Sequence, residues 1–132
     1  MNIAITLPPK LIHEIINGNK CFEMRKALPS YYFPRVDYVA VVEKGTKRCP
    51  LILKVSDFKY VYTDVISEFV TYYSVKLCVP EEWIMKYIEG RKGVWLWKIG
   101  AAHETPNPEK AYRALKLKHN PQSYVYIKKK YL

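Results

Sequence analysis

Three charged side chains that could act together on an anion stand close to one another near the start of the chain. They are Lys20, Glu23 and Arg25, within the stretch from Gly18 to Lys26. Lysine can act as a nucleophile, glutamate can accept protons, and arginine can bind a phosphate through two parallel hydrogen bonds. In a regular strand Lys20 would face away from the other two, but a turn after Gly18 frees it from that rule. We therefore expect the three head groups to converge where a strand begins.

A helix and a strand must hold these charges in place. Leucine and isoleucine recur on one face of the segment 9–17, which predicts a helix that ends at Gly18. After it, Phe22 and Met24 alternate with the charged residues, which predicts a strand over about 21–28 with one buried face.

The rest of the chain reads as more strands than helices. Apolar runs predict strands over 2–7, 36–43, 51–58 (or 51–62), 93–99 and 124–128. Apolar stripes predict a helix capped by Asp64, a helix from Pro80 to Gly90 with Trp83, Ile84, Tyr87 and Ile88 facing the core, and one or two helical turns over 111–116 after a loop over 103–110. Because strands do not alternate regularly with helices, a small mixed barrel is favoured over a doubly wound sheet.

Composition places the chain among small globular proteins. Its 132 residues suit one domain, and a hydrophobic content of 49% argues against disorder. The three cysteines are Cys21, Cys49 and Cys78. Their odd number and wide spacing argue against disulfides and zinc, and we expect a cytoplasmic protein with neither metal nor cofactor. No apolar run approaches the length of a membrane span, so we expect no membrane partner.

The charge balance favours a polyanionic partner. The chain carries 22 Lys and Arg residues against 12 Asp and Glu residues, a net charge of +10. It also contains 12 tyrosines, whose rings can stack on bases while the hydroxyl group stays hydrated. Excess positive charge also serves solubility, but together these features favour contact with nucleic acid.

The pattern G-x-K-x-x-E-x-R over 18–25 resembles the signature of the ASCH domains, a branch of the PUA-like superfamily. The preceding Leu- and Ile-rich helix agrees with it, as does 120–126, which resembles that family's Pro-Gln-Ser-aromatic closing strand. The resemblance implies an α+β fold, a small PUA-like mixed β-barrel of about five to six strands flanked by two to three helices. It covers 1–132 as a single domain.

The resemblance implies a domain that binds nucleic acid, most simply RNA, in a basic cleft beside this motif. The nucleic-acid-binding candidates are Lys20, Arg25, Lys26, Tyr31, Tyr32, Ser123 and Tyr124. Arginine and lysine suit phosphate contacts, and the tyrosine pair lies in an aromatic loop that could stack bases or pack as a lid. Ser123 enters through the resemblance alone, which brings this serine close to the motif turn.

Two metal-independent hydrolases remain as alternatives, with Lys20, Glu23 and Ser123 as the catalytic candidates. One is a ribonuclease, as proposed for members of the family, in which His119 is the one histidine near Ser123. The other is an amidohydrolase of acylated cytidine, as in some small members of the superfamily. Against it, Glu23 stands where that site has threonine, and Lys76 or a neighbour stands where the distal glutamate would lie.

Plainer interpretations also stay open. Lys20 would then be a surface lysine in a turn, and Glu23 and Arg25 a simple ion pair. A protein-interaction role would predict an exposed apolar patch near 31–33 and no affinity for RNA.

Overall fold

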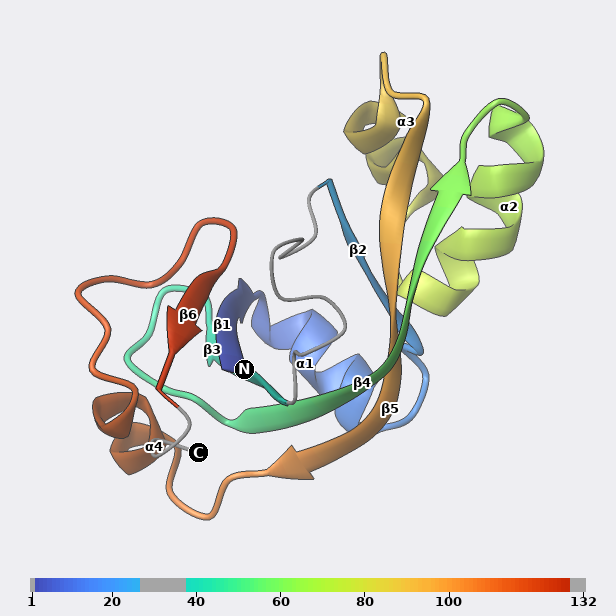
Figure 1. The fold of residues 1–132 in the computed structure, drawn as a ribbon. Helices are drawn as coiled ribbons and strands as arrows, with labels where there is room; N and C mark the ends of the chain where they lie inside the picture. The colour runs from blue at the N-terminus through green and yellow to red at the C-terminus, as the bar shows by residue number, and fades with distance from the viewer. Residues whose placement is uncertain (1, 27–37, 129–132) are drawn as a thin grey trace.

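The structure, a computed structural model, describes residues 2–26 and 38–128. Within these ranges the chain forms six strands and four helices around one mixed sheet (Figure 1). In chain order they are β1 (Asn2–Leu7), α1 (Pro9–Ile16), β2 (Phe22–Arg25), β3 (Tyr38–Glu43), β4 (Leu51–Tyr62), α2 (Ile66–Leu77), α3 (Glu81–Ile88), β5 (Gly93–Glu104), α4 (Pro108–Ala114) and β6 (Val125–Ile127). The α+β class and the number of strands are as expected, and the helices exceed the predicted two to three by one.

The sheet is curled but not closed. Its strand order is β2-β5-β4-β3-β1-β6, with β1 and β3 parallel and the other neighbours antiparallel. Among the residues that the structure describes, β2 and β6 are the two edges and do not pair with each other. The predicted barrel is therefore not confirmed. A side chain connects the two edges instead: Arg25, at the end of β2, donates a hydrogen bond to the main chain just before β6.

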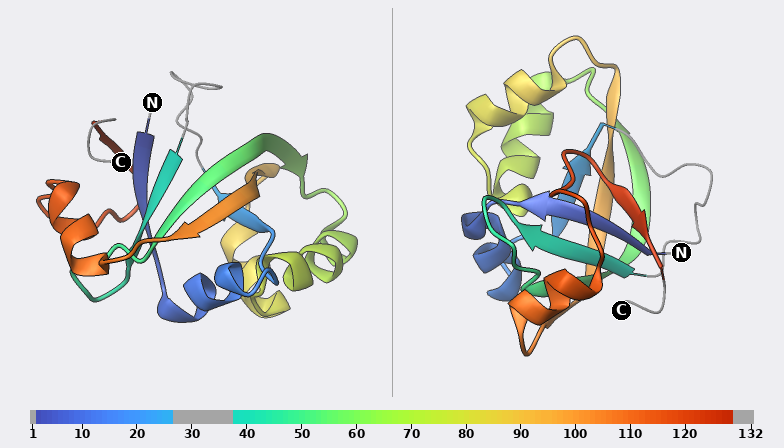
Figure 2. Two further views of the ribbon diagram at one scale, coloured as in Figure 1. Left: turned by 90° about the horizontal axis from the view of Figure 1, so that it is seen from below. Right: turned by 90° about the vertical axis from the view of Figure 1, so that its left-hand side faces the viewer.

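The two longest strands carry one half of the sheet outward as an arm. β4 and β5 pair along nearly their full length, with register shifts around Val55, and the two strands curve together (Figures 1 and 2). Helices α2 and α3 cover one face of this arm, and α4 lies at the opposite end of the molecule (Figure 2). On β5, Leu96 enters the core under α2 and α3, while its neighbour Trp97 enters the core that α1 helps to close. Because side chains alternate between the two faces of a strand, β5 contributes residues to two hydrophobic cores.

The α2 and α3 helices differ from their predicted boundaries and faces. Asp64 does not cap α2, which begins at Ile66 without a side-chain cap. Val65 and Ile66 are half exposed, so the apolar stripe of this helix starts only at Phe69. On α3, Trp83 was predicted to face the core but is exposed to 47%. The apolar periodicity located both helices and misjudged which aromatic and aliphatic residues they bury.

In the C-terminal third, the predicted helical turns over 111–116 are confirmed in part, but the helix starts three residues earlier, inside the predicted loop. α4 begins at Pro108, because Asn107 caps it by accepting a hydrogen bond from the Lys110 amide at 3.0 Å. Strand β5 extends to Glu104, beyond the predicted end at 99, because its small residues pair with the start of β4. The final strand is shorter than the predicted 124–128.

Candidate nucleic-acid interface

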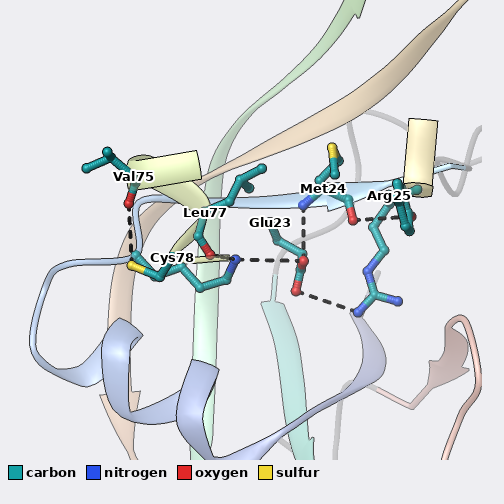
Figure 3. Close-up of polar contacts among 8 residues, drawn as sticks. Glu23, Met24, Arg25, Val75, Leu77 and Cys78 are labelled. Carbon is teal, nitrogen blue, oxygen red and sulfur yellow. Dashed lines mark hydrogen bonds and ion pairs between the residues drawn. The ribbon is translucent and has the colours of Figure 1, made fainter. Parts of the chain in front are cut away.

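The three motif charges converge, as their spacing predicted. Lys20 Nζ lies 3.9 Å from Glu23 Oε1, and Glu23 Oε2 lies 3.7 Å from Arg25 Nη2 (Figure 3). The Lys20 amine also donates a hydrogen bond of 3.0 Å to the carbonyl oxygen of Leu77. The carboxylate of Glu23 therefore sits between two cations, one buried and one near the surface.

Local backbone geometry places the lysine in the interior. Gly18 adopts a φ of +78°, which ends α1 and reverses the chain. The Lys20 amide then bonds to the carbonyl of Glu14, and the Cys21 amide bonds to that of Lys76. These bonds hold the turn against the C-terminal end of α2, where the helix dipole favours a positive charge.

Burial changes the chemistry of the Lys20 amine. Its side chain is exposed to only 1%. Desolvation lowers the pKa of Lys20, and the nearby Glu23 carboxylate opposes part of that shift. A lowered pKa is one requirement for a lysine that acts as a base or nucleophile. The head group of Lys20, however, is shielded from solvent by the surrounding chain.

Glu23 and Arg25 hold hydrogen-bonding capacity that the protein does not use. Glu23 Oε1 accepts a hydrogen bond from the Met24 amide at 3.0 Å, and Arg25 Nη1 donates one to the Ser123 carbonyl at 3.2 Å. In contrast, Glu23 Oε2 and Arg25 Nε are buried and have no hydrogen-bond partner among the described residues. Unsatisfied buried polar atoms are costly, so an acceptor and a donor side by side indicate a place for a ligand.

A pocket of about 350 Å³ opens beside these atoms. It is lined by the end of β1, the start of α1, β2, and the segment from Cys78 through α3. Thr6, whose buried hydroxyl also has no hydrogen-bond partner within the described ranges, contributes to its lining. On another side Trp83 stacks on Tyr87, with ring centroids 4.9 Å apart and planes 17° from parallel. Polar residues and aromatic residues therefore line one small cavity.

The predicted site residues divide into three groups. Glu23 and Arg25 line the pocket, whereas Lys20 lies behind Glu23 and is not part of the lining. Lys26 is exposed at the edge of the site, with its amine 4.7 Å from the ring centre of Tyr87.

The closing-strand residues take less direct places. Ser123 is brought to Arg25 as the resemblance implied, but through its main-chain carbonyl, and its side chain is exposed. Tyr124 is half-buried against the core and contacts Tyr126 edge to face. Tyr31 and Tyr32 lie outside the described residues.

Thr6, Trp83 and Tyr87 line the pocket but were not among the predicted site residues, and the two aromatic residues were predicted to face the core. Trp83 and Tyr87 stand four residues apart on α3, a spacing that places both rings on one helix face. The same spacing is found on helix faces that are buried in a core. Only the position of α3 beside β2 shows that these two rings line a pocket instead.

Two absences bear on the chemistry. In the described ranges, no group of histidine, cysteine, aspartate and glutamate is placed to hold a metal ion. Over the same residues, no helix has the length and apolar character to cross a bilayer.

Comparison with known proteins identifies the fold. No protein-family profile matches the chain, and neither does any curated protein sequence. Among solved structures, the ASCH protein of Zymomonas mobilis superposes with a TM-score of 0.78 at 15% identity, covering 98% of this chain and 90% of that one. Variants of that protein, one with serine replaced by alanine and one with tyrosine replaced by phenylalanine, match at TM-scores of 0.78 and 0.77. This chain has the ASCH fold.

The match to the solved ASCH structures is a match of fold. It covers nearly the whole chain at a low identity, so the likeness concerns architecture and not individual side chains. Arg25 at the end of β2 bonds to Ser123 just before β6, and Arg25 also lines the pocket.

Proposed function

We propose that this protein binds RNA and holds one nucleotide in the pocket between β2 and α3. The observation that carries the proposal is a pair of buried atoms without a hydrogen-bond partner among the described residues, Glu23 Oε2 and Arg25 Nε, on two side chains of the pocket lining. Every nucleobase presents a donor beside an acceptor on its pairing edge. Such an edge complements a carboxylate oxygen and a guanidinium N–H that lie next to each other.

The surroundings of the pocket suit the remaining parts of a nucleotide. Trp83 is nearly half exposed and already stacked on Tyr87, so a base can add to the free side of the indole. Lys10 lines the pocket and is exposed, and Lys26 is exposed beside Tyr87. Both amines can contact phosphates, and the net charge of +10 strengthens the field for a polyanion.

In this proposal Lys20 is a positioning residue. Its buried amine fixes Glu23 Oε1 from one side while Arg25 approaches Oε2 from the other. The carboxylate is thereby fixed between two cations on the lining of the pocket. Lys20 then acts on the ligand through Glu23, without touching a phosphate.

A titration by fluorescence anisotropy tests the proposal. We expect micromolar or tighter binding of a labelled octanucleotide of uridine at about 50 mM salt, with affinity falling steeply by about 200 mM. Arg25→Gln and Trp83→Ala should each weaken binding about tenfold or more. Lys47→Gln, which removes one exposed charge from a residue outside the pocket lining, is the matched control for Arg25→Gln and should change affinity little. Absence of binding by the wild-type protein at low salt would refute the proposal.

Metal-independent hydrolysis of RNA or of acylated cytidine is the second candidate. One observation favours it: the desolvated Lys20 amine, with its lowered pKa, stands next to a carboxylate that can exchange a proton with it. Loss of RNA cleavage or of acylcytidine hydrolysis in Lys20→Ala, with the fold intact by circular dichroism, would support this activity. Cleavage that persists unchanged in the variant would exclude a role for this lysine.

A further inference from the structure

An aromatic strip lies on the arm, on the face opposite α2 and α3. Tyr60 and Tyr62 alternate with Val61 along β4, and Val61 packs into the core under those helices. Trp95 stands on the same face of β5, since Val94 and Leu96 on either side of it enter that core. We call Tyr60, Tyr62 and Trp95 the aromatic strip.

The three rings form a connected surface in which the two tyrosines are exposed and Trp95 is half-buried against the core that α1 helps to close. Tyr62 is exposed to 68% and Tyr60 to 40%. The Tyr60 ring centre lies 5.2 Å from that of Trp95 and 5.4 Å from that of Tyr62, with the planes steeply inclined. A side chain at Gly93 would place its Cβ within 2.6 Å of the Tyr60 ring, so the ring lies directly over the glycine backbone. The Tyr60 ring, at the centre of the strip, is therefore packed against the backbone of β5.

The strip begins at the pocket. Arg25 is paired with Trp95 in the register of β2 and β5, and Trp95 is paired with Tyr60 in that of β5 and β4. These three side chains form a row across three strands, because directly paired residues point to the same face. Arg25 is thus both a residue of the pocket lining and the first member of the row.

Basic residues stand near both ends of the strip. At the inner end is Arg25, and at the outer end the chain beyond Tyr62 is bonded to two basic residues. The Thr63 amide donates to the carbonyl of Lys92, and the Thr63 hydroxyl donates to that of Arg91. Both basic residues are exposed. A protein ligand would gain from the apolar rings alone, whereas a single-stranded polyanion gains from rings and cations together.

We propose that the aromatic strip binds the unstacked bases of a single-stranded RNA that leaves the pocket and runs outward along the arm. This inference rests on the proposed RNA-binding function and specifies the form and extent of its ligand. One nucleotide occupies the pocket, and about three bases follow on the three rings. The protein then reads single strands and excludes a duplex, whose bases are stacked on each other and cannot spread over tyrosine rings.

The length dependence of binding tests this path. The affinities of wild-type protein, Tyr62→Ala, Tyr62→Phe and Tyr72→Ala are measured by anisotropy for a dinucleotide and an octanucleotide of uridine. Wild type should bind the octanucleotide more tightly than the dinucleotide. Tyr62→Ala should lose about tenfold in affinity for the octanucleotide, with the dinucleotide unaffected, since a stacked base contributes roughly that much. Tyr62→Phe keeps the ring and should bind like wild type.

The controls separate this proposal from the general one. Tyr72 is exposed to 57% on α2, on the other face, so Tyr72→Ala removes another largely exposed tyrosine and should leave both affinities unchanged. Arg25→Gln should weaken both oligonucleotides, because it acts at the pocket. If Tyr62→Ala binds the octanucleotide as well as wild type does, the strip is not an RNA surface even though the pocket is. If a duplex binds as tightly as the single strand, the proposed path is wrong.

Discussion

Arg25 Nη1 donates a hydrogen bond of 3.2 Å to the carbonyl oxygen of Ser123, across 98 positions of sequence. Arg25 ends one edge strand of the sheet and Ser123 lies just before the other. A side chain therefore spans the gap that backbone pairing leaves open. The same guanidinium lies 6.0 Å from the ring of Trp97 and close to Glu23, so its position is fixed from several sides.

Replacing Arg25 with lysine should loosen the link between the two edges. Lysine keeps the charge but cannot reach Glu23 and the Ser123 carbonyl with one planar group. We expect a loss of about 1–2 kcal/mol in the free energy of unfolding, measured in urea. Hydrogen exchange should quicken at β6 more than at β3. Equal exchange at β6 in the variant and in wild type would show that the bond does not hold this edge.

Removing the Ser123 hydroxyl should leave the fold unchanged. The contact with Arg25 uses the main-chain carbonyl, and the side chain is exposed. The free energy of unfolding of Ser123→Ala should stay within about 0.5 kcal/mol of wild type. Its effect on RNA is therefore interpretable: a normal affinity with lost cleavage would favour the hydrolase, and a lowered affinity would give the hydroxyl a binding role.

The burial of Lys20 should appear in the pH dependence of stability. Its pKa in the folded protein is lowered by desolvation, so the folded state binds fewer protons than the unfolded state between that lowered pKa and the ordinary value of about 10.4. Stability gained from this group therefore rises with pH across that window and is constant below it. Lys20→Met lacks the group and should lack the rise.

The measurement is a difference between two proteins, because other groups titrate in the same range. Burial raises the pKa values of Tyr73 and Tyr87, and each of these lowers stability as the pH increases. Urea unfolding of wild type and of Lys20→Met from about pH 8 to 10.5 cancels what the two share. A difference that does not change with pH would mean that the amine is equally protonated in the folded and unfolded states.

The cysteines should differ in reactivity. Cys49 is fully buried, and desolvation raises its pKa to about 11, whereas Cys21 is exposed. With iodoacetamide at about pH 8, native Cys21 should be alkylated more than about 100-fold faster than Cys49. Mass spectrometry of the modified peptides gives both rates, and urea should remove the difference. Rapid native modification of Cys49 would reveal frequent opening of the core beneath α4.

The local pattern was sufficient to predict most elements and the convergence of Lys20, Glu23 and Arg25. The glycine after α1 and the alternation of apolar and charged residues along β2 are local features. They can be recognised from a few residues without knowing the tertiary structure. The pocket depends on long-range packing instead. Trp83 faces a cavity only because α3 is docked beside β2, and no spacing in the sequence encodes that neighbour.

Other differences arise from competing local signals. Asp64 is a good capping residue, yet α2 starts two positions later, because tertiary packing of Phe69 and Val70 sets where the helix begins. Asn107 and Pro108 were sufficient to predict the start of α4, but the surrounding polar residues read as a loop. The open sheet reflects the absence of main-chain pairing between β2 and β6 in the described ranges, a property of three-dimensional curvature.

Leu96 and Trp97 are consecutive residues that enter different interiors. Neither interior can come apart while the other stays intact, because each is built on the same stretch of backbone. Melting should consequently occur in one step, with fluorescence of the tryptophans and helical circular dichroism changing at the same temperature. The arm with the tyrosines and the part of the molecule with the charged motif are therefore coupled in stability. A mutation that destabilises one of them should also destabilise the other.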